Sequence, residues 1–479
     1  MKIKQITFYL FILLGSTIGF ANAPRPNIIF ILCDDLGIGD IGAYGQKKLK
    51  TPHIDSIAQN GLKFTAHYSG STVCAPSRCA LMTGKHMGHA VVRGNYGRRK
   101  HIPGEIGEFP LPEDALTLAK VLQSAGYTTG MFGKWGLGGP RNSGATQKQG
   151  FDEFLGYYSQ SLAHSYYPER LWHNSDPVPL DRKIYSHDLI WNSGIDFLRE
   201  QAKTSKPFFL YLPVTVPHAS MSAPRELHEK WRKIYPQFDK RIGIYADKEA
   251  PDHCVTNPIA GFAAMMENLD NQIGELIQEL KEWGIYENTL LIFTSDNGAH
   301  REGGHDPEFW NSNGDYRGFK RDLYDGGIRT PMLISWPRYI PPGTTTDKLS
   351  AFWDWLPTFA ELAGAKLPHS TKIDGISLAP LLTRNKKVKQ GSHHYLFWEF
   401  TEGTPKMAIR FKHWKAIWFY EKDGITLKRT ELYNLAKDPG EENNLASTYP
   451  ETLKELATFR DAAHSESSAF PFQKPKSVR

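Results

Sequence analysis

The chain has 479 residues, of which 40% are hydrophobic, 12% aromatic and 23% charged. These proportions are those of a globular protein and exclude a disordered or fibrous chain. The formal net charge of +6 is compatible with a small anionic substrate but too weak to indicate nucleic-acid binding. Because single cores stop growing at roughly 250 to 300 residues, the length predicts one large domain and a smaller one.

The first residues have the layout of a cleavable secretory signal. Lysines at 2 and 4 precede an apolar run over 6–20, and small residues follow at 21–23. A membrane anchor is the alternative, but the run is shorter than the roughly 20 residues that a span needs. We therefore expect a signal peptide over 1–23, no stable membrane anchor, and a periplasmic or secreted protein.

Four predicted strands each lead into polar residues. They are 27–32 before Asp34 and Asp35, 127–132 before Lys134, 207–216 before His218, and 289–294 before Asp296 and Asn297. The apolar residues of 27–32 are typical of a strand buried on both faces of a mostly parallel sheet. Open α/β sheets place their chemistry at the carboxyl ends of such strands, so we expect these polar residues to lie close together.

Helical spacing of apolar residues is clearest over 259–283. Beyond about residue 385 the pattern changes to short β-like runs and one polar helix candidate at 450–460. We predict an α/β fold with a large, mostly parallel sheet sandwiched by helices, and a smaller α+β domain with an antiparallel sheet and a helix. The predicted domains are 24–384 and 385–479.

The two polar pairs Asp34-Asp35 and Asp296-Asn297 suggest a metal site. Calcium prefers roughly six to eight oxygen ligands, and carboxylates offset its charge. Each pair alone is equally typical of a turn, because both precede a glycine within two residues. Together, at the ends of two buried strands, they favour a hard divalent cation.

A segment from Cys74 onward carries a family resemblance. Cys74-Ala75-Pro76-Ser77-Arg78, continued by Thr83-Gly84, resembles the signature of the type I sulfatases of the alkaline phosphatase superfamily. The companion motifs recur in that family's order: Asp34-Asp35-Leu36-Gly37, Gly133-Lys134-Trp135, Pro217-His218, Ser295-Asp296-Asn297-Gly298, and Lys320 ahead of Asp325-Gly326-Gly327-Ile328-Arg329. The resemblance covers essentially the whole mature chain.

This resemblance implies an arylsulfatase-like hydrolase of sulfate monoesters with one calcium ion per chain. A formylglycine-generating enzyme would convert Cys74 to 3-oxoalanine (formylglycine). The implied metal ligands are Asp34, Asp35, Asp296, Asn297 and an oxygen of modified residue 74. A thiolate would be a poor calcium ligand, and an aldehyde hydrate removes that mismatch. One hydroxyl of the hydrate would attack sulfur and release the alcohol, and the other would then expel sulfate from the covalent ester.

The resemblance also implies roles for four basic residues. Arg78, one helical turn after Cys74, would hold the hydrate, with a purely structural salt bridge as the alternative. Lys134 and Lys320 would bind sulfate oxygens. His218, alone or with Lys320, would protonate the leaving oxygen.

One position departs from the family pattern. The family often reads Gly-Lys-Trp-His-Leu-Gly, and here the fourth position is Gly136. That histidine is commonly assigned as the base that triggers sulfate elimination. We hypothesise that His164 replaces it from a neighbouring loop; the alternative is that His164 contacts the substrate.

We expect a sulfated carbohydrate as substrate, bound by polar and aromatic side chains from surrounding loops. The candidates are Arg93, Trp310, Arg317, Trp398 and Glu399. A solvated basic loop around Arg93 and core packing of the tryptophans are the alternatives. The sugar, the sulfate position, exo or endo action and the oligomeric state stay open.

The four cysteines of an exported chain could form two disulfides. If Cys74 is modified, Cys33, Cys79 and Cys254 remain, and at most one disulfide with an undetermined pairing is possible.

Two other functions fit part of the pattern. A phosphate or phosphonate monoester hydrolase of the same superfamily would share the sheet and the metal carboxylates. Its zinc-dependent members need further His and Asp ligands, and the sequence shows no matching cluster. A non-catalytic glycan-binding homologue is the second alternative. Gly136 favours it, whereas the intact Cys74, Arg78, Lys134, His218 and Lys320 oppose it.

Overall fold

A computed structural model describes residues 25–95, 108–245, 254–368, 371–385 and 387–473. The expected signal peptide lies outside these ranges. Among the described residues, no helix has both the length and the apolar character needed to cross a membrane.

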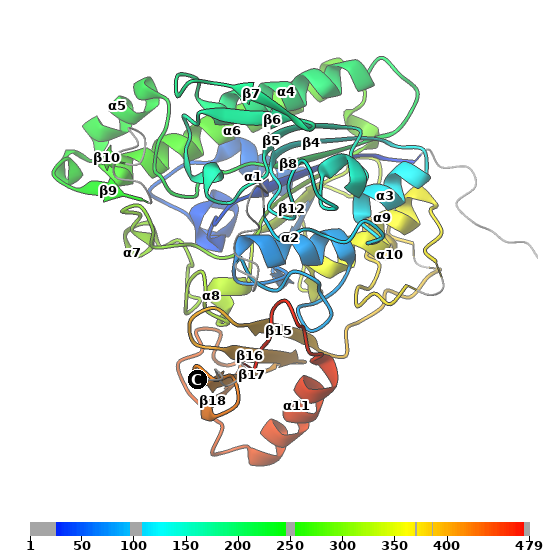
Figure 1. Ribbon diagram of the computed structural model, residues 1–479, viewed down its shortest axis with the longest axis vertical. Helices are drawn as coiled ribbons and strands as arrows, with labels where there is room; N and C mark the ends of the chain where they lie inside the picture. The colour runs from blue at the N-terminus through cyan, green and yellow to red at the C-terminus, as the bar shows by residue number, and fades with distance from the viewer. Residues whose placement is uncertain (1–24, 96–107, 246–253, 369–370, 386, 474–479) are drawn as a thin grey trace, which may run out of the picture.

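A ten-stranded sheet forms the centre of the large domain (Figure 1). Its strands are ordered β13-β2-β12-β11-β1-β8-β4-β5-β6-β7. The central strands β11 (Thr289–Ser295), β1 (Asn27–Cys33), β8 (Phe208–Pro213), β4 (Thr128–Lys134) and β5 (Glu153–Tyr157) run parallel to one another. Their carboxyl ends therefore lie at one edge of the sheet, as predicted for a mostly parallel α/β fold.

The outer strands complete the sheet with mixed directions. They are β2 (Leu62–Phe64), β6 (Arg170–His173), β7 (Asp176–Pro179), β12 (Met332–Ser335) and β13 (Thr344–Thr346). Strand β12 is antiparallel to β11 and β2, and β6 is antiparallel to β5 and β7.

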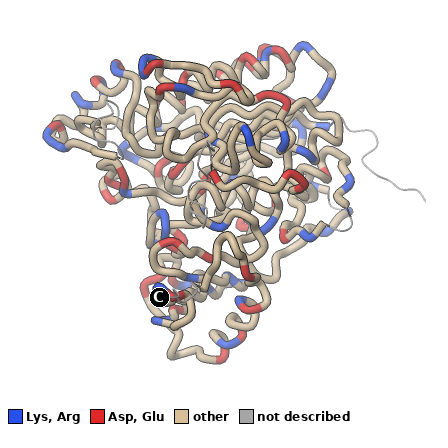
Figure 2. The backbone as a smooth tube through the Cα atoms, viewed as in Figure 1, with Lys and Arg blue, Asp and Glu red and all other residues tan. Residues whose placement is uncertain are grey.

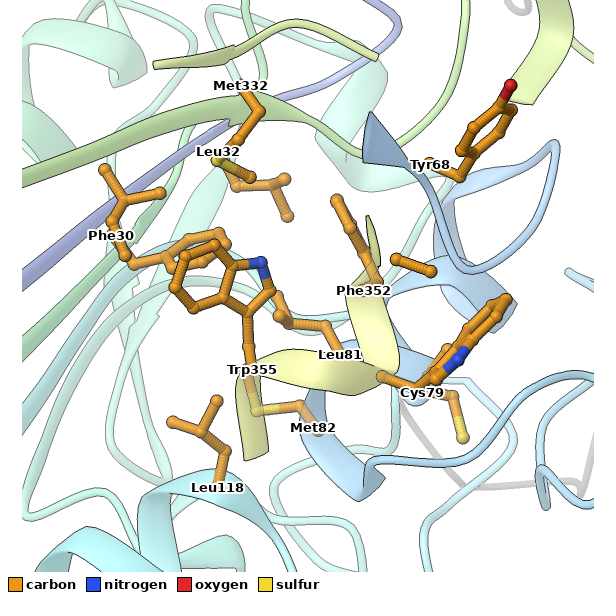
Figure 3. Packing of buried hydrophobic residues seen from close by; sticks show 14 of the residues in the cluster. Phe30, Leu32, Tyr68, Cys79, Leu81, Met82, Leu118, Met332, Phe352 and Trp355 are labelled. Carbon is orange, nitrogen blue, oxygen red and sulfur yellow. The ribbon is translucent and has the colours of Figure 1, made fainter. Parts of the chain in front are cut away.

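Side chains of β1 alternate between two hydrophobic cores, one on each face of the sheet. Ile28, Phe30 and Leu32 belong to one core, which also contains residues of α2 (Cys74–Thr83), α3 (Leu118–Ser124) and α9 (Trp355–Ala363). Trp355 of α9 lies against Phe30 with ring centroids 5.7 Å apart, close to Leu81 and Met82 of α2 (Figure 3).

The opposite core contains Ile29 and Ile31 together with residues of α1 (Pro52–Gln59), α4 (Ser186–Gln201) and α6 (Pro258–Glu282). Helix α6 matches the helix predicted over 259–283. The sheet is therefore covered by helices on both faces, and this confirms the predicted architecture of the large domain.

The C-terminal part is a four-stranded antiparallel sheet of β15 (Leu396–Phe400), β16 (Lys406–Phe411), β17 (Trp414–Tyr420) and β18 (Leu427–Asn434). Helix α11 (Pro450–Ala463) packs on it through Leu456 and Ala463. This unit lies at the lower end of Figure 1, as the predicted smaller α+β domain.

Short elements connect these layers. The further helices are α5 (Arg225–Ile234), α7 (Pro307–Trp310), α8 (Asp325–Ile328), α10 (Ala379–Leu382), and the 3-10 helices η1 (Ile38–Asp40), η2 (Gly42–Tyr44), η3 (Thr146–Gln149), η4 (Leu162–His164), η5 (Pro236–Phe238), η6 (Tyr286–Asn288) and η7 (Phe352–Asp354). The further strands are β3 (His67–Tyr68), β9 (Ile242–Ile244), β10 (Cys254–Thr256) and β14 (Ser350–Ala351).

A buried ionic cluster joins the two domains. Lys415 Nζ of β17 lies 2.8 Å from Asp325 Oδ1 of α8 and 2.9 Å from Glu441 Oε1, and all three side chains are buried. Elsewhere, basic and acidic residues are interspersed around the described chain (Figure 2). Charged side chains are thus buried at the contact between the two domains as well as at the strand ends.

Candidate active site

The carboxyl ends of β1 and β11 bring four oxygen-bearing side chains together. Asp34 and Asp35 follow β1, Asp296 and Asn297 follow β11, and all are buried. The backbone N–H of Asp35 donates to Asp296 Oδ1 at 3.1 Å, and Asn297 Nδ2 donates to Asp35 Oδ1 at 2.7 Å. Asn297 Oδ1 is buried and has no hydrogen-bond partner among the described residues. This oxygen and the carboxylates form a donor set that fits a hard divalent cation.

Burial and neighbouring charges shift the pKa values of Asp296 and Asp34 in opposite directions. Burial and then the neighbouring Asp34 raise the pKa of Asp296 to about 7. Burial also opposes ionisation of Asp34, but Lys134, His218 and Arg78 outweigh it and hold the pKa of Asp34 well below its usual range. A bound cation would favour the ionised form of every carboxylate here.

Cys74 begins the helix α2 and faces Asp34. Its thiol donates to Asp34 Oδ1 at 3.1 Å. Burial and then Asp34 raise the pKa of the Cys74 thiol well above its usual range, so the unmodified side chain is a thiol and a poor nucleophile.

Helix α2 is held from both ends. Val73 is extended and provides no side-chain cap, and the Oδ1 atom of Asn95 instead accepts a hydrogen bond from the N–H of Ala75. Gly84 ends the helix in the left-handed conformation at φ 67°, which favours glycine. All ten residues of α2 are buried. The start of the helix, and with it Cys74, is therefore fixed in position.

Arg78 ties this helix to two strand ends. Its Nε and Nη2 atoms donate to Asp296 Oδ2 at 3.1 and 2.8 Å, and Nη1 donates to the carbonyl oxygen of Lys134 at 2.5 Å. Lys134 in turn points back to the same site, because its Nζ donates to Asp34 Oδ2 at 2.5 Å. Both cations lie within the carboxylate group.

Lys320 and His218 both lie beside Asp35. Lys320 Nζ is 2.8 Å from Asp35 Oδ2 and 3.0 Å from His218 Nε2. His218 Nδ1 lies 2.6 Å from the carbonyl oxygen of Ala219, which requires the proton to be on Nδ1. His218 Nε2 therefore accepts from Lys320 when the ring is neutral. Burial and then Lys320 lower the pKa of His218 well below its usual value.

Glu302 completes this side of the site and was not among the predicted residues. Its Oε2 atom lies 3.1 Å from Lys320 Nζ and 3.5 Å from His218 Nε2, and its Oε1 atom pairs with Arg321 at 2.7 Å. The only sequence signal was its place in the loop directly after Asp296-Asn297-Gly298.

His164 lies beside this group, in η4. Its ring stacks on His218 with centroids 4.7 Å apart and planes inclined by 9°. The structure thus places His164 next to the site, in the loop after β5. Whether it acts as a base stays a hypothesis.

Three of the residues that we predicted to contact the substrate, Arg93, Trp398 and Glu399, are buried. Arg93 is paired with Glu399 at 2.9 Å, with side chains 4% and 0% exposed. Trp398 is fully buried, and its Nε1 donates to the carbonyl oxygen of Ser69. These side chains join the C-terminal domain to the large one, and the proposal that they contact a substrate stays a prediction.

Trp310 and Arg317 are the other two residues predicted to contact the substrate. Trp310 is fully buried beside Phe262, with ring centroids 5.4 Å apart. Arg317 donates to the Tyr433 hydroxyl and to the carbonyl oxygen of Glu441, so it too links the domains. Core packing was the alternative for the tryptophans, and the structure favours it.

Cys33 and Cys79 are buried free thiols in the cores on opposite faces of the sheet. A disulfide between these two is excluded.

Comparisons with known proteins agree with this arrangement. The family model described as Sulfatase matches residues 26–365, and the model described as N-sulphoglucosamine sulphohydrolase, C-terminal, matches residues 314–460. The chain is 33% identical to arylsulfatase A of Homo sapiens, with 93% of this chain and 89% of that protein covered. It is 28% identical to N-acetylgalactosamine-6-sulfatase of Sus scrofa, with coverage of 93% and 87%. The solved structure of Ps i-CgsB in complex with k-i-k-neocarrahexaose is 27% identical, has a TM-score of 0.75, and covers 93% of this chain and 95% of that chain.

Proposed function

The chain belongs to the sulfatase family and is a sulfatase. We propose that it hydrolyses a sulfate monoester of a carbohydrate, and that it uses a formylglycine formed from Cys74 and one calcium ion. The observation that carries this proposal is the position of Cys74. Its Sγ atom lies 3.1 Å from Asp34 Oδ1, at the start of a buried helix and within a group of carboxylates. A thiol at this position is a poor calcium ligand and a poor nucleophile, whereas the oxygen atoms of an aldehyde hydrate can fill both roles.

Calcium would be held by Asp34, Asp35, Asp296 and Asn297. The unpartnered Oδ1 atom of Asn297 and the three buried carboxylates support this assignment. The cation would supply Lewis acidity and would lower the pKa of the hydroxyl on residue 74.

The remaining residues bind and orient the substrate. Lys134 Nζ pairs with Asp34 and Lys320 Nζ pairs with Asp35, and both Nζ atoms are fixed donors for sulfate oxygens. Arg78 fixes the helix that carries residue 74. Lys320 lies 3.0 Å from His218 Nε2, so this pair can deliver a proton to the leaving oxygen.

A sulfated carbohydrate is the substrate class we propose. The support is the similarity to N-acetylgalactosamine-6-sulfatase and to the protein solved with k-i-k-neocarrahexaose. The sequence of residues 1–23 supports export, so the proposed location is the periplasm or outside the cell. Maturation would involve a formylglycine-generating enzyme.

The mass of the peptide containing residue 74 tests the modification. In protein from the native host, conversion of Cys74 to formylglycine lowers the mass by roughly 18 Da. An unmodified cysteine in active enzyme would contradict the proposal. Turnover of an aryl sulfate, an aryl phosphate and a panel of sulfated mono- and oligosaccharides then separates a sulfatase from a phosphate monoester hydrolase and identifies the sugar.

A further inference from the structure

A glutamine fills the space beside Gly136. Gly136 has φ +75°, and a Cβ atom added to it would lie 2.2 Å from Gln160 Nε2 and 3.3 Å from Gln160 Cδ. The next neighbour of that position is Ala75 Cβ at 3.9 Å. The carboxamide of Gln160 therefore occupies the volume that a side chain at 136 would need, and this volume borders the residue next to Cys74.

The amide nitrogen of Gln160 is buried without a partner. The residue is 7% exposed, and Nε2 has no hydrogen-bond partner among the described residues. An unsatisfied buried polar group destabilises the folded state, so proteins rarely keep one without a reason. An unpaired donor whose volume borders Ala75, the residue after Cys74, is suited to an oxygen of a bound ligand.

The backbone of Gln160 is fixed relative to Gly136. Its N–H donates to Glu108 Oε1 at 2.6 Å, and the N–H of Glu108 donates to the carbonyl oxygen of Gly138 at 3.2 Å. Four residues later in the same loop, His164 stacks on His218. This loop thus extends along the site from the start of α2 to His218, and it places Gln160 at the end near residue 74.

We infer that Gln160 binds the substrate, with its Nε2 hydrogens donating to an oxygen of the sulfate group at residue 74. This inference rests on the proposed role of residue 74 as the nucleophile. A carboxamide donates hydrogen bonds but does not take up a proton at neutral pH, so Gln160 holds the sulfate and is not the base. It also excludes a side chain at position 136.

Gln160→Glu is the sharpest test because it keeps the shape and replaces the donor by a negative charge. We expect KM for an aryl sulfate and Ki for inorganic sulfate to rise at least about tenfold, because like charges placed together weaken binding strongly. We expect kcat to fall less than KM rises, and Tm to stay close to that of the parent. Gln59→Glu, an exposed change on α1, is the matched control and should leave KM and Ki unchanged.

A double-mutant cycle of Gly136→Ala and Gln160→Ala tests whether the Gln160 carboxamide occupies the volume beside Gly136. The new Cβ atom would displace the Gln160 carboxamide, so Gly136→Ala and Gln160→Ala should each raise KM and Ki. The double variant should be no worse than the poorer single variant, because both changes remove the same contact.

The inference is overturned if Gln160→Glu and Gln160→Ala are folded and keep the parent's KM and its Ki for sulfate. If Gln160→Glu fails to fold, Gln160→Met, uncharged and of similar length, gives the same comparison. Failure of the proposed function looks different: the parent enzyme, with residue 74 converted, would neither hydrolyse a sulfate ester nor be inhibited by inorganic sulfate.

Discussion

Arg78 donates two hydrogen bonds to one oxygen of Asp296, from Nε at 3.1 Å and from Nη2 at 2.8 Å. Both side chains are buried, and the pair connects the helix of residue 74 to the end of β11. A lysine cannot reproduce this planar two-pronged contact.

We therefore expect Arg78→Lys to lower the free energy of unfolding by about 3 kcal/mol, in the range found when a buried pair is broken. We expect turnover to fall by at least about a hundredfold, since displacement of the catalytic group has effects of that size. Denaturant unfolding and steady-state kinetics measure the two effects. Arg199→Lys, at an exposed site of α4, is the control. Unchanged stability and turnover in Arg78→Lys would contradict the prediction.

Removal of calcium should both destabilise and inactivate the protein. Asp34, Asp35 and Asp296 are buried together, so the proposed calcium ion would stabilise the folded state. At a free calcium concentration of a hundred times Kd, binding would raise the free energy of unfolding by about 2.7 kcal/mol. We expect a chelator to lower Tm and abolish turnover, and added calcium to restore both. Asp296→Asn should shift the calcium dependence of Tm to higher concentration. A chelator-treated protein with the original Tm and activity would exclude a structural calcium ion.

Asp40 should make stability depend on pH. Burial raises the pKa of this carboxyl to about 7, whereas in the unfolded chain it ionises near pH 4. The folded protein therefore holds a proton that the unfolded chain has lost, and the free energy of unfolding falls as pH rises from about 4 to 7. The effect is on the order of 4 kcal/mol.

Asp40→Asn should remove this decline, because the amide oxygen still accepts from Gly37, which lies 2.8 Å from Asp40 Oδ2. Relative to the parent, the variant should gain a few kcal/mol of stability between pH 4 and pH 8. Unfolding measured at both pH values in the same calcium-containing buffer tests this. A difference between variant and parent that does not change with pH would be the contrary result.

Lys415 should be essential for the contact between the domains. Replacing it with methionine leaves Asp325 and Glu441 buried close together without their shared cation. We expect Lys415→Met to lower the free energy of unfolding by about 3 to 5 kcal/mol. Lys412→Met, two residues before β17 begins and exposed, should have little effect. Equal unfolding curves for the two variants would refute the prediction.

The sheet and its strand ends were predictable because burial on both faces leaves a direct trace in sequence. The apolar residues within 27–32 belong to β1, and the helical spacing at 259–283 corresponds to α6. Helix α2 left no such trace, because all ten of its residues are buried and no polar face marks its period. Its place was predictable only from the motif around Cys74.

Loop contacts were not predictable for a physical reason. Glu302 contacts Lys320, and Gln160 fills the space beside Gly136, because of the conformations of the loops that carry them. Neither loop conformation can be predicted from the local residue pattern. Trp310 and Trp398 illustrate a second ambiguity, because both are fully buried in the structure. An aromatic residue with polar neighbours is typical both of a sugar-binding surface and of packing between layers, and only the three-dimensional contacts separate the two.

The complete burial of α2 also has a consequence for biosynthesis. Cys74 is 1% exposed, and its neighbours on the helix are covered by η7, α3 and α9. An enzyme that oxidises this thiol needs the segment in an extended, accessible form. The proposed conversion of Cys74 would therefore have to take place before the chain finishes folding, because the folded protein covers this thiol.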